Sequence, residues 1–249
     1  PSAQQPYYPA ASKSRGMVQG NGGSIFEDVR RQNRRVLTED EAYELCASYG
    51  MRVPRFRVAK SPEEAVEAAR SIGYPVVLKV LSPQVMHKTD VGGVVVGLMN
   101  DDGVRSAYEG ILGSVRSLRP DARISGILVE SQAPPSVEVI VGVTEDRKFG
   151  KVLMFGLGGI FAELMEDVSF RLIPVDEDDA REMMSEVRGY DVLKGFRGRP
   201  PLDVDSIVDL LLSTSRMVVE NPQISQMDLN PVIVYEKGYV VVDCKVLLG

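Results

Sequence analysis

Helical and strand-like segments alternate along this sequence, and the alternation restricts the possible folds more than any single motif does. Residues 61–73 are typical of a helix, because Ser and Pro stand at the start and Gly73 stands at the end. Strand-like apolar runs follow at 75–81 and 93–99, and residues 101–118 again have helical periodicity. Short strands that alternate with helices predict an α/β (α+β) fold rather than a helical bundle.

The second half continues this pattern and predicts a division into two parts. Further strands and helices are expected at 126–129, 137–144, 151–155, 176–187, 203–219, 226–235 and 239–247, the last two joined as a hairpin. We expect one domain over residues 24–249, with subdomains of about 38–125 and 126–249. Residues 1–23 have almost no large aliphatic side chains and are expected to be flexible, and Met17 is a candidate start preceded by a leader.

The composition excludes several classes of function. The net charge of −6 argues against a general nucleic-acid binder, which usually carries a basic excess. The two cysteines, Cys46 and Cys244, lie far apart and form no Cys-x-x-Cys motif, which predicts neither a disulfide framework nor a zinc site. The sequence has no apolar run of membrane-spanning length and no signal-peptide core at its N-terminus. We therefore expect a cytoplasmic protein that does not act on membranes.

The only histidine of the sequence lies in a polar loop between two predicted strands. Lys79 stands near the end of the strand before the loop, Lys88 follows His87 directly, and Gly92 and Gly93 close the loop. Glycine-rich turns allow backbone N–H groups to approach phosphate oxygens, and a lysine adds positive charge to the same site. A neutral imidazole beside such a loop is a candidate phosphate acceptor. The alternative is a simple β-turn next to an exposed histidine.

The closing hairpin carries a second candidate site. Asp228 and Asn230 are two residues apart on one strand and therefore face the same side, and the hairpin is expected to bring Asp243 opposite them. Oxygen ligands of this kind suit Mg²⁺, which keeps several waters and bridges phosphates. The alternative is that Asn230 starts a turn and Asp243 caps one.

The order of these features resembles an ATP-grasp domain, which has two subdomains with the nucleotide between them. The resemblance implies that Lys79 contacts the nucleotide phosphates and that Glu138 holds the ribose hydroxyls. It also implies that Asn230 and Asp243 hold Mg²⁺. The adenine would lie against a hinge segment that contains Glu130, Ser131 and Ala133.

Three longer segments narrow the resemblance to the β subunits of ADP-forming (NDP-forming) acetyl-CoA and acyl-CoA synthetases, relatives of succinyl-CoA synthetase. The segments are VLKVLSPQVMHKTDVGGVVVGL, FGLGGIFAELMEDVSFRLIP and DLNPVIVYEKGYVVVDCKVLLG. The implied reaction converts acyl-CoA, ADP and phosphate into acid, CoA and ATP. In that family the phosphate passes through a β-chain phosphohistidine, which His87 matches, and Asp228 would orient its imidazole.

The resemblance also implies a partner chain. The sequence has no Gly-x-Gly-x-x-Gly segment and no second histidine, so the CoA-binding domains and the first phosphohistidine are expected on a separate α subunit. An α2β2 assembly is expected. The preferred acyl group and the choice between ADP and GDP are not encoded in these motifs.

Two other functions fit the same nucleotide-binding pattern. One is an ATP-grasp carboxylate–amine or carboxylate–thiol ligase that acts through an acyl phosphate. The other is a non-catalytic nucleotide-sensing module. Neither would transfer phosphate to His87, so acid-labile phosphate on the protein separates both from the acyl-CoA synthetase.

Overall fold

The computed structural model describes residues 22–159, 167–195, 198 and 200–249. Its contacts divide the chain into two compact units. We call residues 37–41 and 54–133 the small unit, and the remaining described residues the large unit. Most of the expected flexible segment, residues 1–21, lies outside the described residues. The expected subdomain boundary after residue 125 remains a prediction.

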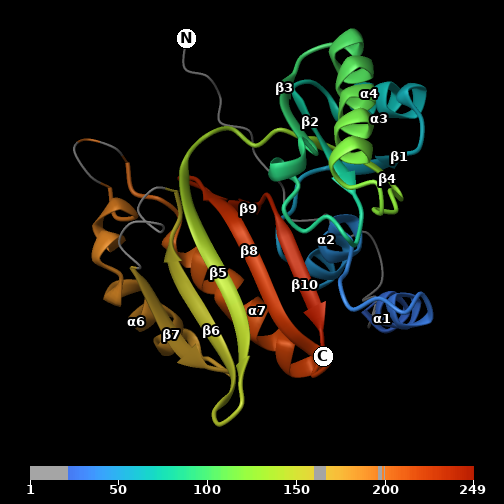
Figure 1. Cartoon of the computed structure of the whole chain (residues 1–249). Helices are drawn as coiled ribbons and strands as arrows, with labels where there is room; N and C mark the ends of the chain where they lie inside the picture. Colours follow the sequence, from blue (N-terminus) through green and yellow to red (C-terminus); the bar gives the residue numbers. More distant parts are fainter. Residues whose placement is uncertain (1–21, 160–166, 196–197, 199) are drawn as a thin grey trace, which may run out of the picture. The chain divides into compact units, whose positions relative to one another are not determined.

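The small unit contains an antiparallel sheet with two helices on one face (Figure 1). Within the described residues, four strands make up this sheet in the order β1-β4-β2-β3. The strands are β1 Phe56–Ala59, β2 Val76–Leu81, β3 Val94–Leu98 and β4 Gly126–Ser131. The helices are α3 Pro62–Ile72 and α4 Asp101–Leu118. Of these four strands, β4 comes last in the sequence, yet it lies between β1 and β2 in the sheet.

Local signals explain the ends of these helices. The side chain of Ser61 accepts a hydrogen bond from the Glu64 N–H (3.1 Å) and caps α3, which ends at Gly73 with φ +93°. The side chain of Asn100 accepts from the Gly103 N–H (2.9 Å) and caps α4. The predicted helix boundaries are confirmed to within one residue for α3 and fully for α4.

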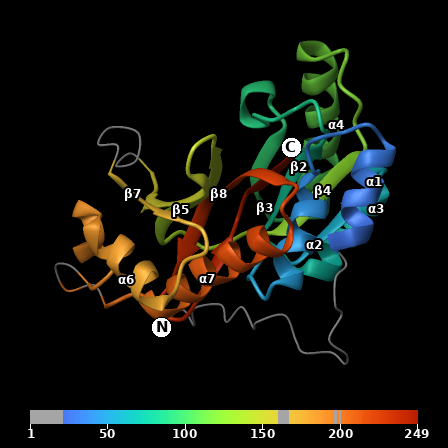
Figure 2. The same cartoon turned by 90° about the horizontal axis from the view of Figure 1, so that it is seen from below.

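The large unit contains the second sheet, and two helices cover one of its faces (Figure 2). In the part of the chain that the structure describes, this sheet has six strands in the order β10-β8-β5-β6-β7, with β9 also paired to β8. The strands are β5 Val137–Asp146, β6 Gly150–Leu157, β7 Val168–Leu172, β8 Ile224–Val234, β9 Tyr239–Val241 and β10 Cys244–Leu248. The covering helices are α6 Glu177–Glu186 and α7 Val204–Glu220.

The remaining elements are short. They are α1 Gly22–Arg31, α2 Glu39–Ser48, and the 3₁₀ helices η1 Thr89–Val91 and η2 Arg188–Val192. None of the helices in the described residues is both long enough and apolar enough to cross a membrane.

The structure differs from the predicted elements in two places. Strand β7 was not predicted; it pairs with β6 at the edge of the large sheet. The predicted closing strand 239–247 is divided into β9 and β10, and both parts pair with β8. The two parts are separated by Val242 and Asp243.

The two cysteines lie side by side, although 198 residues separate them in the sequence. Their Sγ atoms are 3.5 Å apart, longer than the roughly 2 Å of a disulfide bond. Both residues are buried, Cys46 on α2 and Cys244 on β10. This thiol pair packs α2 against the large sheet.

Candidate functional site

His87 is an exposed residue between two neighbours that the fold holds in place. Val85 is buried in the core of the small unit, and the side chain of Lys88 is only 10% exposed. The Lys88 carbonyl accepts hydrogen bonds from the N–H groups of Gly93 (2.7 Å) and Val91 (3.4 Å). The predicted polar loop therefore contains a turn, and backbone hydrogen bonds to Lys88 fix this turn directly after His87.

Both predicted loop glycines have a structural reason to be glycine. Gly92 has φ +65° and ends η1 in the left-handed conformation. A Cβ on Gly93 would lie 2.6 Å from Val80 Cγ1 and 2.9 Å from the Lys88 carbonyl oxygen. The turn that follows His87 therefore requires glycine for its own backbone, and the predicted contact of these glycines with phosphate stays a prediction.

We expect Gly93→Ala to destabilise the protein by about 1–3 kcal/mol, because the added methyl group overpacks a site closed by backbone. Urea unfolding measures this change. Gly110→Ala is the matched control, since nothing lies within 4 Å of its Cβ position in α4. That control should gain up to about 1 kcal/mol from helix propensity. Equal stability of the two variants would contradict the tight packing at Gly93.

A buried cluster of four charged side chains lies beside this turn. The Lys79 ammonium is 2.8 Å from Glu39 Oε1 and 2.9 Å from Glu130 Oε1. The second oxygen of Glu39 lies 3.0 Å from Lys88 Nζ. Both glutamate side chains are 1% exposed. The cluster joins α2, β2, β4 and the turn after His87.

Glu39 carries a charge in spite of its burial. Burial pushes the pKa of Glu39 upward, but the positive charges of Lys79 and Lys88 and their hydrogen bonds prevail, so the pKa lies below its ordinary value. The stabilisation by this carboxylate is therefore fully present above its unfolded-state pKa. It is lost only as the pH falls through the lower folded-state pKa.

The predicted hinge segment is fixed by backbone hydrogen bonds at the end of β4. The Ser131 N–H donates to the Arg55 carbonyl (2.9 Å), and the Ser131 hydroxyl accepts from the Arg55 N–H (3.1 Å). The Gln132 N–H donates to the Pro75 carbonyl (3.1 Å), and Ala133 is the last residue of the small unit. The Glu130 side chain points to Lys79.

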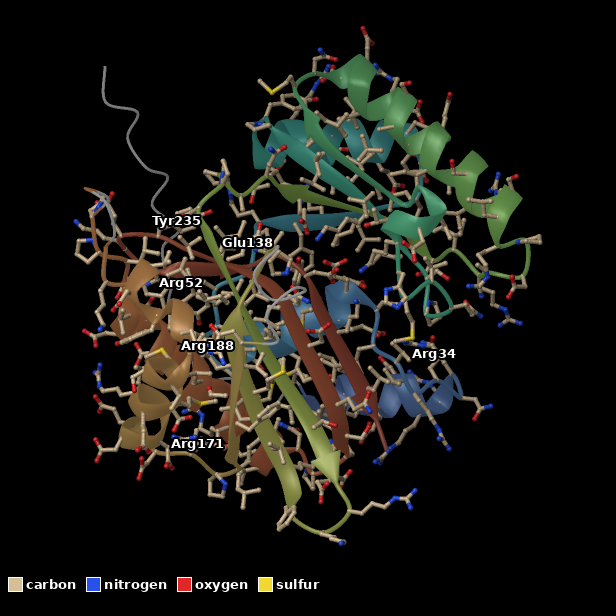
Figure 3. All side chains as sticks on the ribbon, turned by 60° about the vertical axis from the view of Figure 1, so that its left-hand side comes forward. Arg34, Arg52, Glu138, Arg171, Arg188 and Tyr235 are labelled. Carbon is tan, nitrogen blue, oxygen red and sulfur yellow. The ribbon has the colours of Figure 1, made fainter. Side chains whose placement is uncertain are left out.

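Glu138 lies near the start of β5 (Figure 3), where its backbone is close to Gly158. The Gly158 N–H donates to the Glu138 carbonyl (2.7 Å), and a Cβ on Gly158 would be 2.8 Å from Glu138 Cβ. A hydrogen bond from the Tyr235 hydroxyl to the Pro134 carbonyl (2.9 Å) holds the approach to this strand. Residues 160–166 of the quoted glycine-rich segment lie outside the described residues.

The predicted oxygen donors lie on β8 and in the gap between β9 and β10 of the large unit. On β8, Asp228 and Asn230 alternate with the buried Leu229, so the predicted shared side is confirmed. The Asn230 N–H donates to the Asp243 carbonyl (3.1 Å), which places Asp243 opposite Asn230 as predicted. The carboxylate of Asp228 lies 3.9 Å from Lys245 Nζ. Asp228 on β8 therefore lies next to the ammonium group of Lys245 on the neighbouring strand β10.

The donor set suits Mg²⁺ held together with substrate phosphates. In the described part of the chain, no group of three His, Cys, Asp or Glu side chains forms a metal cage. Asn230 on β8 provides an amide oxygen, and Asp243, between β9 and β10, provides a carboxylate next to it. Mg²⁺ is commonly bound through one or two protein oxygens, with waters and phosphate completing its shell.

The predicted residues therefore divide into two groups. The small unit contains His87, Lys79, Gly92, Gly93, Glu130, Ser131 and Ala133. The large unit contains Glu138, Asp228, Asn230 and Asp243. The sequence reasoning missed Glu39, whose only local signal was its place in the first helical turn after Thr38.

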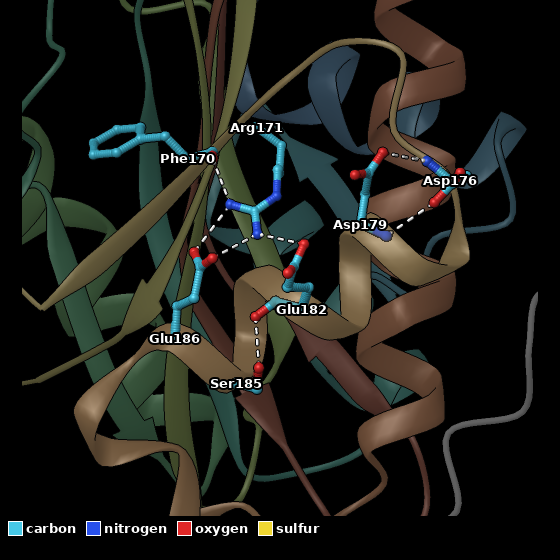
Figure 4. A network of polar contacts seen from close by, with 7 residues as sticks. All are labelled: Phe170, Arg171, Asp176, Asp179, Glu182, Ser185 and Glu186. Carbon is cyan, nitrogen blue, oxygen red and sulfur yellow. Dashed lines mark hydrogen bonds and ion pairs between the residues drawn. The ribbon is translucent and has the colours of Figure 1, made fainter.

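Arg171 forms a surface ion-pair network rather than part of either group (Figure 4). Its guanidinium lies 2.7 Å from Glu186 and 3.1 Å from Glu182, both on α6. These contacts attach β7 to α6.

Comparison with known proteins gives the same family throughout. Residues 28–248 match the family model described as an ATP-grasp domain. The beta subunit of the ADP-forming acetate–CoA ligase II of Pyrococcus furiosus is 44% identical over 93% of this chain and 99% of its own length. The ADP-forming acetate–CoA ligase I of Archaeoglobus fulgidus is 45% identical over 90% of this chain, which covers 33% of that longer protein.

Solved structures agree. The acetyl-coenzyme A synthetase 1 of Candidatus Korarchaeum cryptofilum, in complex with coenzyme A, Ca-AMPCP and HgCl+, has a TM-score of 0.89 and 49% identity, covering 92% of this chain and 100% of that one. A second structure of that enzyme holds coenzyme A and Mg-AMPPCP, with its phosphohistidine segment pointing towards the nucleotide site. Its TM-score is 0.80 with 46% identity, covering 91% and 99% of the two chains. The predicted resemblance and fold are confirmed, and this chain belongs to the ATP-grasp domain family, within the beta subunits of the ADP-forming acetate–CoA ligases.

Proposed function

We propose that this chain provides the nucleotide-binding and final phosphoryl-transfer part of an ADP-forming acetate–CoA ligase. The overall reaction converts acyl-CoA, ADP and phosphate into a carboxylic acid, CoA and ATP. The observation that carries the proposal is His87, an exposed imidazole between a buried Val85 and an anchored Lys88. An imidazole in this position is accessible to phosphate, while its neighbours fix where it can go.

The roles of the nucleotide-binding residues follow from their chemistry. Lys79 is the lysine assigned to the phosphates, and its ammonium is paired with Glu39 and Glu130 in this structure. The N–H groups of Gly92 and Gly93 donate to the carbonyls of Thr89 and Lys88, so these glycines shape the turn after His87. The segment of Glu130, Ser131 and Ala133 borders the adenine, and its hydrogen bonds to Arg55 and Pro75 keep it in place. The Glu138 carboxylate accepts hydrogen bonds from the ribose hydroxyls.

Asn230 and Asp243 would hold Mg²⁺, as their oxygen donors fit that ion. When bound, Mg²⁺ neutralises charge on the phosphoryl oxygens. Asp228 is assigned to the histidine: a carboxylate that accepts from one imidazole nitrogen fixes the tautomer and stabilises the positive charge of the ring. Its neighbour Lys245 lies 3.9 Å from the Asp228 carboxylate on the adjacent strand.

The proposal includes an α subunit that binds CoA and carries the first phosphohistidine, in an α2β2 assembly, and a cytoplasmic location. The Pyrococcus furiosus relative is itself a beta subunit by name, and the Archaeoglobus fulgidus relative is a longer single chain. Both relatives support the proposal that this chain binds the nucleotide and that another subunit or domain binds CoA.

We expect the isolated chain to make no ATP from acetyl-CoA, ADP and phosphate, because its sequence has no Gly-x-Gly-x-x-Gly segment and no second histidine. Addition of the α subunit should restore turnover, measured by coupled detection of ATP. In the same experiment the isolated chain should still accept acid-labile phosphate from labelled ATP with Mg²⁺. Sustained ATP synthesis by the isolated chain would contradict the assignment of CoA chemistry to a partner.

A further inference from the structure

Glu39 uses its two carboxylate oxygens for two different lysines. Oε1 lies 2.8 Å from Lys79 Nζ on β2, and Oε2 lies 3.0 Å from Lys88 Nζ in the turn before η1. The carboxylate is 1% exposed, so both contacts are shielded from water. A buried ion pair depends strongly on geometry, because a displaced partner leaves a desolvated charge behind.

Lys88 is consequently held at two points. Its side chain is bound by Glu39, and its carbonyl oxygen accepts the Gly93 N–H at 2.7 Å. The exposed His87 is the residue directly before it. Any movement of the imidazole therefore starts from a fixed C-terminal end.

We propose that Glu39 is a positioning residue that anchors Lys88 and thereby fixes the C-terminal end of the segment that carries His87. The proposal rests on the proposed function, in which His87 carries phosphate. Glu39 touches neither phosphate nor nucleotide in this role. It acts through Lys88, while Lys79 remains held by Glu130 as well.

The net charge of the cluster gives a way to distinguish a positioning role of Glu39 from a role in nucleotide binding. Two carboxylates and two ammonium groups cancel, so Glu39→Gln leaves one additional positive charge near the proposed phosphate contact. Attraction for an anionic nucleotide should not decrease. We therefore expect the nucleotide dissociation constant to stay the same or fall, while phosphoryl transfer to His87 becomes slower.

The first experiment tests the anchor without any nucleotide. Limited trypsin digestion, followed by mass spectrometry, measures cleavage after Lys88 relative to cleavage after the exposed Arg123 of the same unit. Lys88 should resist cleavage in the unaltered chain. In Glu39→Gln the ratio should rise about tenfold or more, because local unfolding around Lys88 no longer has to break the ion pair with Glu39. Glu63→Gln is the matched control, because Glu63 is an exposed glutamate in the first turn of α3.

The second experiment measures transfer from labelled ATP to the chain in single turnover at saturating nucleotide. Glu39→Gln should slow it by about ten- to a hundredfold, the usual cost of a misplaced reacting group. Lys88→Met, which leaves Glu39, Lys79 and Glu130 in place, should slow it similarly. The double variant should be no slower than Glu39→Gln alone, because the ion pair between Glu39 and Lys88 is already lost in that variant.

Each result has a defined meaning. An unchanged cleavage ratio in Glu39→Gln would overturn the anchor, and so would additive losses in the double variant. A lower melting temperature with an unchanged transfer rate would reduce Glu39 to a purely structural residue and also overturn it. Absence of labelling in the unaltered chain would reject the proposed function instead, and the trypsin ratio would still decide whether Glu39 anchors Lys88.

Discussion

Replacing His87 by alanine is expected to abolish the acid-labile phosphate that labelled ATP and Mg²⁺ leave on this chain. In the assembly with the α subunit, ATP formation should fall by about a thousandfold or more, because the covalent carrier of the phosphate is lost. His87 is the only histidine of the sequence, so any phosphohistidine detected by mass spectrometry must lie there. The affinity for ADP, measured by calorimetry, should hardly change, since the imidazole is exposed and outside the buried charge cluster.

Asp228→Ala provides the comparison for this variant. If Asp228 orients the imidazole, its loss should slow the transfer but leave some labelling, whereas His87→Ala leaves none. Undiminished ATP synthesis by His87→Ala with its α subunit would show that the relay assignment is wrong. Direct transfer from the α-subunit histidine to ADP would then be the better account.

Replacing Lys79 by alanine is expected to destabilise the protein by about 3–5 kcal/mol, because it removes the cation between two buried carboxylates. The apparent free energy of unfolding in urea measures this loss. The burial of Lys79 changes how its role in nucleotide binding must be tested, since a weaker affinity could simply reflect unfolding. Nucleotide titrations of this variant therefore belong at a temperature where circular dichroism shows it folded.

Arg171→Ala is the matched control for Lys79→Ala. Arg171 also pairs with two glutamates, but its partners Glu182 and Glu186 are 67% and 47% exposed. Exposed ion pairs of this kind contribute about 0–1 kcal/mol. A loss below about 1 kcal/mol for Lys79→Ala as well would contradict a tightly packed, water-excluded cluster.

Features set by neighbouring residues could be predicted from the sequence. The start of α3 at Ser61 and the start of α4 after Asn100 depend on side chains that cap the adjacent turn, so the predicted and observed ends coincide closely. The alternation of Asp228 and Asn230 with buried residues depends only on the twofold repeat of a strand. The alternation of strands and helices predicted the fold class, and the quoted segments around His87, Gly158 and Asn230 suggested the family.

Features set by distant residues could not be predicted. Glu39 meets Lys79 across 40 positions, and nothing in the pattern around either residue records that pairing. Sequence reasoning accordingly treated Lys79 as a strand-end cation and left Glu39 out of the site. The contact of Cys46 with Cys244, and the pairing of the short β7 at a sheet edge, are tertiary in the same sense.

The position of β4 between β1 and β2 has a consequence for how the chain is made. During synthesis, β1 emerges from the ribosome long before its sheet neighbour, since Arg55 and Ser131, which bond at that edge, are 76 residues apart. A nascent chain that stops at residue 125 holds Lys79 and Glu39 but not Glu130, and β1 has no strand beside it. The small sheet must therefore close late, around its last strand, and unfinished chains expose unpaired edges to association with one another.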